Sequence, residues 1–150
     1  MRILKVNPEG EAKVISLCND TWEESLELAI CNELGCMPAD PVVVNGIWPG
    51  CEYTSNILIY IYAKENQENE DENSYTGRLI ADITEGITGP AVIVKYVRTE
   101  DRWGYHPCSM GRDELKFLLE KMNIYKIENL YPHQDRKEGL WWKKEKQNES

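Results

Sequence analysis

One segment of the chain alternates in the manner of a β-strand that is covered on both faces. Residues 57–63 read Ile-Leu-Ile-Tyr-Ile-Tyr-Ala. Successive side chains of a strand point to opposite faces of the sheet, so the isoleucines share one face, and Leu58, Tyr60 and Tyr62 share the other. The pattern therefore predicts a central strand with both faces at least partly covered.

The remaining strand signals are short runs rich in Val, Ile and Leu that are bounded by turn residues. Asn7-Pro8-Glu9-Gly10 separates the first two runs, which predicts an N-terminal β-hairpin. Asn45-Gly46 and Gly89-Pro90 mark further turns. Besides 57–63, the expected strands are residues 2–6, 12–17, 42–44, 78–82 and 91–97, with a short edge strand at 102–106.

Two helices are expected from their caps and apolar stripes. Thr21 begins a capping box and Gly35 can adopt the left-handed conformation that ends a helix, so a helix is placed at residues 22–34. Ser109 is expected to cap a second helix that runs to about residue 122. Together these elements predict an α+β fold, in which a mainly antiparallel sheet of five to seven strands has two helices packed on one face.

Residues 64–76 form an acidic stretch that is poor in apolar residues. Such a segment buries little apolar surface, so we expect a mobile, solvated insertion within a single domain at residues 1–132. Its five carboxylates supply over half of the chain's net charge of -9, which argues against direct nucleic-acid binding. Residues 133–150 are expected to form a polar C-terminal tail or a short docking helix.

The apolar runs are too short for a membrane protein, since a spanning helix needs about 20 residues. The N-terminal Met-Arg-Ile-Leu-Lys-Val also lacks the apolar region and cleavage site of a signal peptide. We therefore expect a cytoplasmic protein that does not contact a membrane.

The chain has five cysteines, an odd number, and none stands in a CxxC pair. Neither a complete disulfide framework nor a zinc ribbon fits this spacing, so we expect free thiols, no bound metal and no cofactor. The alternative is a metal site that combines His106 with some of Cys31, Cys36, Cys51 and Cys108.

Cys108 and His106 are close enough in sequence to be considered as a catalytic nucleophile and its base. Residues two apart on a strand share a face, but Pro107 is expected to break the pleat between them. A cysteine–histidine enzyme also needs an orienting group and oxyanion donors. The glycines form neither a GxGxxG nor a Walker sequence. We therefore expect no catalytic residues and no enzymatic activity.

Thirteen of the fourteen aromatic residues are Trp or Tyr. Such rings combine apolar area with a polar tip and are enriched at interfaces. Trp141 and Trp142 are adjacent, so they cannot both face one helix stripe. The expected contact surface consists of Trp48, Trp103 and Tyr105, together with Trp141 and Trp142.

Several segments carry a resemblance to a known family. The chain opens with Met-Arg-Ile-Leu-Lys-Val-Asn-Pro, continues with Lys-Val-Ile-Ser-Leu, and later contains Arg-Leu-Ile-Ala-Asp-Ile, Gly-Pro-Ala-Val-Ile-Val-Lys-Tyr-Val and Gly-Arg-Asp-Glu-Leu-Lys-Phe-Leu-Leu-Glu-Lys-Met. Over about residues 1–122 this order resembles a small domain of unknown function common on phages, plasmids and integrative elements of Gram-positive bacteria. The acidic insertion and the C-terminal tail depart from that pattern. The resemblance implies an accessory protein of a mobile element, for which blocking a host defence system is a common role.

Aromatic contact residues without a catalytic constellation favour a non-enzymatic binding protein. It would occupy a host protein or sequester a small ligand, and a homo-oligomer is compatible with either role. One alternative is an acidic DNA mimic that blocks a nucleic-acid enzyme by presenting a regular row of carboxylates. The other alternative is a small hydrolase or nucleotide-processing enzyme, which requires a pocket with convergent titratable groups.

Overall fold

The computed structural model describes residues 1–17, 23–48, 56–65, 70–80, 86–101 and 103–129. Its strands are β1 (Arg2–Val6), β2 (Glu11–Ser16), β3 (Val42–Asn45), β4 (Ile57–Ala63), β5 (Ala91–Arg98), β6 (Tyr105–Cys108) and β7 (Lys126–Glu128). Its helices are α1 (Glu23–Leu34), the short α2 (Ser74–Gly77) and α3 (Arg112–Met122). Within these ranges no helix has the length and apolar character needed to cross a membrane.

Strand β5 organises the sheet. The strand order is β3-β4-β5-β1-β2-β7, and β6 also pairs with β5. One edge of β5 pairs with β4 from Ala91 to Val97. The other edge is divided, because Ala91 to Ile93 pair with β1 whereas Lys95 to Arg98 pair with β6. These strands pair antiparallel except for β2 and β7, which run parallel.

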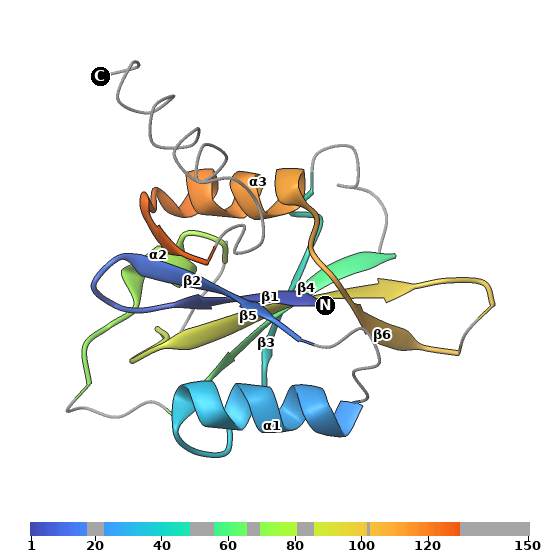
Figure 1. Ribbon diagram of the computed structural model, residues 1–150, viewed down its shortest axis with the longest axis horizontal. Helices are drawn as coiled ribbons and strands as arrows, with labels where there is room; N and C mark the ends of the chain where they lie inside the picture. The colour runs from blue at the N-terminus through green and yellow to red at the C-terminus, as the bar shows by residue number, and fades with distance from the viewer. Residues whose placement is uncertain (18–22, 49–55, 66–69, 81–85, 102, 130–150) are drawn as a thin grey trace.

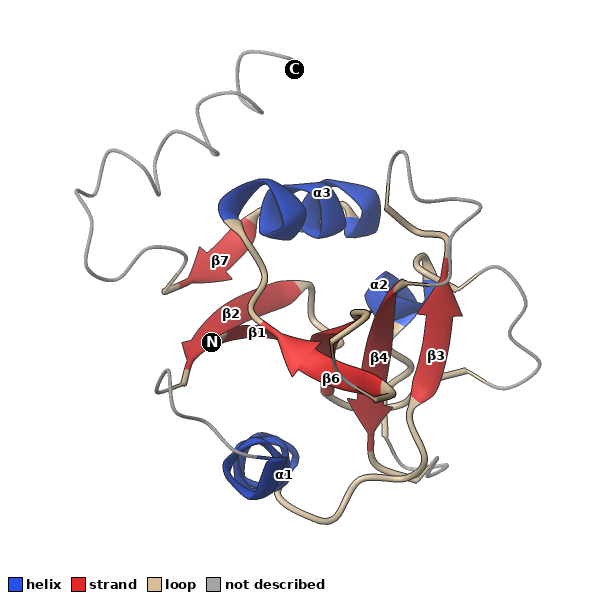
Figure 2. Ribbon diagram, turned by 90° about the vertical axis from the view of Figure 1, so that its right-hand side faces the viewer, coloured by secondary structure: helices blue, strands red, loops and turns tan. Residues whose placement is uncertain are grey.

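Helices cover both faces of the sheet (Figure 1, Figure 2). On one face α3 buries Leu118 in a core that also contains Ile93 of β5. On the other face α1 buries Ile30 against Val92 and Val94 of the same strand. Neighbouring residues of β5 thus contribute to opposite cores, as the alternation of a strand requires.

The predicted class is confirmed, since the fold is α+β with a mainly antiparallel, seven-stranded sheet. The expectation that two helices pack on one face is wrong for α1 and α3, which lie on opposite faces. Four successive residues of β5, Ala91 to Val94, are buried. A strand buried on both faces needs a packing layer on each side, and one helix supplies each layer.

The strands predicted at 2–6, 12–17, 42–44, 57–63 and 91–97 correspond to β1 to β5, and the first predicted helix corresponds to α1. The second helix begins at Arg112, later than expected from Ser109. The Ser109 hydroxyl instead accepts a hydrogen bond from the Arg2 N–H at 2.9 Å, while the Glu114 carboxylate accepts one from the Gly111 N–H at 2.9 Å. The edge strand expected at 102–106 is shifted along the chain to β6.

Residues 78–80 do not form the predicted strand. They make a turn after α2, in which the Leu79 N–H donates to the Thr76 carbonyl at 3.0 Å. The Arg78 guanidinium donates to the carbonyl of Met122 at 2.8 Å, so this segment satisfies the last turn of α3 rather than a strand ladder. Residues 81 and 82 lie outside the described residues.

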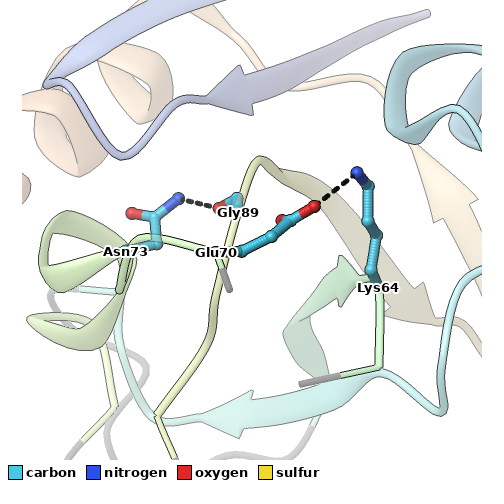
Figure 3. Close-up of polar contacts among 4 residues, drawn as sticks. All are labelled: Lys64, Glu70, Asn73 and Gly89. Carbon is cyan, nitrogen blue, oxygen red and sulfur yellow. Dashed lines mark hydrogen bonds and ion pairs between the residues drawn. The ribbon is translucent and has the colours of Figure 1, made fainter. Parts of the chain in front are cut away.

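The acidic segment 64–76 is anchored to the sheet at its C-terminal end. Asn73 is 1% exposed, and its side-chain amide donates to the carbonyl of Gly89 at 2.9 Å (Figure 3). It also donates to the carbonyl of Val6 at 3.0 Å. Its side-chain oxygen accepts from the Thr76 N–H at 3.2 Å, which caps α2. The expectation of a solvated insertion is therefore wrong at these two buried residues. Residues 66–69 and the predicted tail 133–150 lie outside the described residues.

Candidate binding surface

Three tyrosines gather on the sheet face that α1 occupies. Tyr62 of β4 lies opposite Val92 of β5, whose side chain packs against α1, so Tyr62 faces the same side. By alternation along each strand, Tyr60 and Tyr96 also point to this side. The rings of Tyr60 and Tyr96 stack with centroids 4.0 Å apart and planes at 21°, and the hydroxyl oxygens of Tyr62 and Tyr96 are 2.8 Å apart. The three half-buried rings therefore form one connected unit.

The environment of Tyr62 keeps its phenol protonated. Burial raises the pKa of Tyr62 above its usual value of 10.0, and the hydrogen bond to Tyr96 acts in the same direction. Electrostatic interactions with Tyr96, Tyr60 and Glu27 of α1 raise the pKa further. An ionised phenol would lose solvation and face neighbouring negative charge, so the neutral form is favoured. Tyr62 thus contributes a neutral hydroxyl group to this unit.

The aromatic surface continues onto β6. Tyr105 lies opposite Arg98, and the guanidinium carbon of Arg98 is 5.5 Å from the centroid of the Tyr105 ring. Arg98 also donates to the side-chain oxygen of Asn56 at 3.3 Å. Since Arg98 is two residues from Tyr96 on β5, Tyr105 joins the same sheet face. We call the set Tyr60, Tyr62, Tyr96 and Tyr105 the tyrosine face.

Trp103 lies at the end of this face, in the connection between β5 and β6. Its side chain is fully exposed, at 103% of the reference area. Gly104 follows with φ +76°, a left-handed conformation that glycine adopts without steric cost, and Tyr105 then begins β6. The hairpin thereby exposes an indole two residues before Tyr105 of the tyrosine face.

The structure places Trp48 on the opposite side of the sheet from Tyr105. Trp48 is only 5% exposed and belongs to the core on the α3 side, where its ring lies 5.8 Å from that of Phe117. Tyr105 faces the α1 side, so Trp48 and Tyr105 do not line one cleft. Trp48 is a core residue in this fold. Trp141 and Trp142 lie outside the described residues.

The Cys108 and His106 pair is better arranged than the sequence indicates. Strand β6 continues through Pro107, so both side chains point to the α3 side of the sheet. Lys95 lies directly opposite Cys108, but its ammonium is engaged by Glu114 at 2.6 Å. Nδ1 of His106 is buried, and none of the described residues hydrogen-bonds to it. The described part of the chain therefore supplies no group that orients the imidazole as a base.

The described cysteines, Cys31, Cys36 and Cys108, are free thiols. The Cys31 thiol donates to the sulfur of Met37 at 3.5 Å, a contact between two soft, polarisable side chains. No three His, Cys, Asp or Glu side chains gather as a metal site in the described ranges. Cys18 and Cys51 lie outside these ranges.

A cavity of about 300 Å³ lies beside the ends of β3 and β4. Its walls are mainly apolar, and Asp40, Lys64 and Glu65 contribute the charged groups. The Lys64 ammonium pairs with Glu70 at 2.9 Å (Figure 3), and this hydrogen bond raises the pKa of Lys64. The cation of Lys64 is therefore already paired at the edge of this cavity.

The tyrosine face could not be identified as a unit from sequence alone. Alternation at residues 57–63 does set Tyr60 and Tyr62 on one face, but the partners on β5 and β6 depend on the register of pairing. Comparison of the chain with protein-family models, with curated proteins and with solved structures finds no match. The site is therefore interpreted from its own geometry.

Proposed function

We propose that this protein acts by binding a partner without turnover, and that the tyrosine face and Trp103 form the contact surface. The partner is a host protein, or a small ligand, and the protein belongs to a phage or mobile element that uses this binding to inhibit host defence. The observation that supports the proposal is the full exposure of Trp103 beside a row of half-buried tyrosines.

Aromatic anchors are an efficient source of binding free energy. A tryptophan or tyrosine buries about 150–250 Å² when it is covered, and only two side-chain torsions must be fixed. The stacking of Tyr60 on Tyr96 and the hydroxyl contact of Tyr96 with Tyr62 already restrain these rings. Because the unbound rings are already ordered, little conformational entropy remains to be lost on binding.

We expect the net charge of the chain to affect the rate of association with a partner more than the free energy of the bound contact. Several described carboxylates are paired with lysines: Glu33 lies 3.5 Å from Lys5, and Glu114 lies 2.6 Å from Lys95. Such pairs interrupt a continuous row of free carboxylates, which a DNA mimic requires. We therefore give the aromatic contact precedence over DNA mimicry and assign the net charge of -9 a role in steering association.

The test is calorimetric titration of a partner captured from host lysate with the wild type and with Trp103→Ala. Losing this exposed aromatic anchor should weaken binding by about 30-fold, or about 2 kcal/mol. Leu28→Ala is the matched control, because Leu28 is also an exposed apolar side chain, at 65%, but lies on α1. The control variant should bind as tightly as the wild type.

Three results would contradict the proposal. Normal binding by Trp103→Ala would show that the contact surface is assigned wrongly. Loss of nearly all affinity on neutralising Glu65, Asp71 and Glu72, with Trp103→Ala unaffected, would replace it with DNA mimicry. Recovery of a chemically altered ligand would identify an enzyme.

A further inference from the structure

Three sulfur-containing side chains lie at the C-terminal end of α1. Residues 31–37 read Cys-Asn-Glu-Leu-Gly-Cys-Met and belong to the continuously described stretch 23–48. The helix ends at Leu34, and Gly35 has φ +77°, a left-handed conformation that turns the chain. The Gly35 N–H donates to the Cys31 carbonyl at 2.8 Å. This turn brings the residues that follow back towards the last turn of the helix.

Two of the three sulfurs are already in contact. Sγ of Cys31 and Sδ of Met37 are 3.5 Å apart. At a metal–sulfur distance of about 2.3 Å, two ligands of one ion lie at most about 4.6 Å apart, so one ion can contact both sulfurs. At their present separation they would subtend about 100° at the ion, which leaves room for a third ligand. Cys36 directly precedes Met37 and is exposed, so its thiol has room to turn towards the same ion.

We propose that Cys31, Cys36 and Met37 bind one monovalent copper ion, Cu(I), at the end of α1. Thiolate and thioether sulfurs are soft ligands that select Cu(I), whereas structural zinc sites use thiolates and imidazoles. Binding releases the two thiol protons to solvent and leaves the oxidation state of copper unchanged. The expectation of a metal-free chain considered only cysteine and histidine as ligands, and the contact with Met37 adds a thioether to that set.

The surroundings of the three sulfurs fit a copper ion that exchanges with solvent-borne ligands. The Lys64 ammonium interacts electrostatically with Cys36, and a neighbouring cation favours the thiolate form that binds metal. Met37 is 72% exposed and Cys31 is half-buried, so an incoming thiolate of another protein can reach the ion. The inference goes beyond the proposed function and does not depend on it, because these sulfurs are not part of the tyrosine face.

Competition with bicinchoninate, a chromophoric Cu(I) chelator, tests the site on the reduced full chain in the absence of oxygen. The wild type should take one equivalent of copper from the chelator. Met37→Leu keeps every thiol and a similar side-chain volume but removes the thioether, so the affinity should fall by at least about 10-fold. Cys31→Ser and Cys36→Ser should weaken binding at least as strongly. Cys108→Ser is the control, because this thiol lies on β6, and it should bind like the wild type.

Methyl resonances of the methionines provide a test on the wild type alone. One equivalent of Ag(I), a redox-stable ion that also prefers sulfur ligands, should shift the methyl resonance of Met37. The resonances of Met110 and Met122, which are 0% exposed, should not move. An unmoved Met37 resonance would overturn the inference. Unchanged Cu(I) affinity in a folded Met37→Leu protein would overturn it as well, since copper would then be held by thiols without the thioether.

Discussion

A single buried amide joins three parts of the molecule that are distant in sequence. Asn73 follows the acidic residues, and its side chain hydrogen-bonds to the end of β1, to Gly89 before β5, and to the first turn of α2. Each partner is a backbone group, and buried backbone groups are nearly always hydrogen-bonded. An asparagine is suited to this position because its side chain offers two donors and an acceptor together.

Asn73→Ala should be among the more destabilising single substitutions. It removes the three side-chain hydrogen bonds of a residue that is 1% exposed. Buried groups left unsatisfied cost about 1–3 kcal/mol each, so we expect a loss of roughly 3 kcal/mol or more in the free energy of unfolding. Urea denaturation measures the loss. Asn32→Ala, at an exposed position of α1, is the control and should stay within about 0.5 kcal/mol. Equal stability of the two variants would refute the anchoring role.

Tyr62 should make stability decrease at alkaline pH. Its pKa is raised in the folded state above 10.0, so below that pH the phenol is neutral in both states and adds no pH dependence. Above it, the unfolded state loses a proton that the folded state retains, so the free energy of unfolding falls as pH rises. We expect the advantage of the wild type over Tyr62→Phe to stay constant up to about pH 9 and to shrink as the pH rises above about 10. Urea midpoints of both proteins decide this, and a constant difference would contradict it.

Local sequence patterns predict most of the strands, but they do not determine which face of the sheet each helix covers. The alternation of β4 and the apolar run of β5 are visible in the sequence because a strand repeats every two residues. The apolar stripe of α1 identifies which side is buried but not which face of the sheet receives it. Residues 78–80 were misassigned because Leu79 and Ile80 look strand-like, whereas Arg78 is held by the end of α3. That contact lies 44 positions away in the chain and has no local signal.

Across the whole molecule, tryptophan occurs both as a buried core residue and as an exposed surface residue. Trp48 is 5% exposed and packs on Phe117, whereas Trp103 is fully exposed in a hairpin. Sequence could select both as aromatic candidates but could not separate them, because burial here depends on contacts with distant elements. The tyrosine face has the same origin, since it is assembled from three strands by long-range register. The sequence therefore identifies the aromatic residue types, but the register in which β4, β5 and β6 pair is needed to place them on one face.

The two cores should unfold together, because β5 contributes Ile93 to one and Val92 to the other. Ile30→Ala, in the core under α1, should lower the free energy of unfolding by about 2–5 kcal/mol through lost contacts and a cavity. Leu28→Ala on the same helix should stay within about 0.5 kcal/mol, since its side chain is 65% exposed.

The decisive measurement for this coupling is made on the opposite side of the sheet. Trp48 emission, recorded with the remaining tryptophans replaced by phenylalanine, reports the core under α3. Far-ultraviolet circular dichroism reports the whole fold. For a cooperative two-state domain, both probes must show the same midpoint shift on Ile30→Ala. A shift in circular dichroism with an unchanged Trp48 transition would mean that the α1 layer melts alone, and that the shared strand does not couple the two cores.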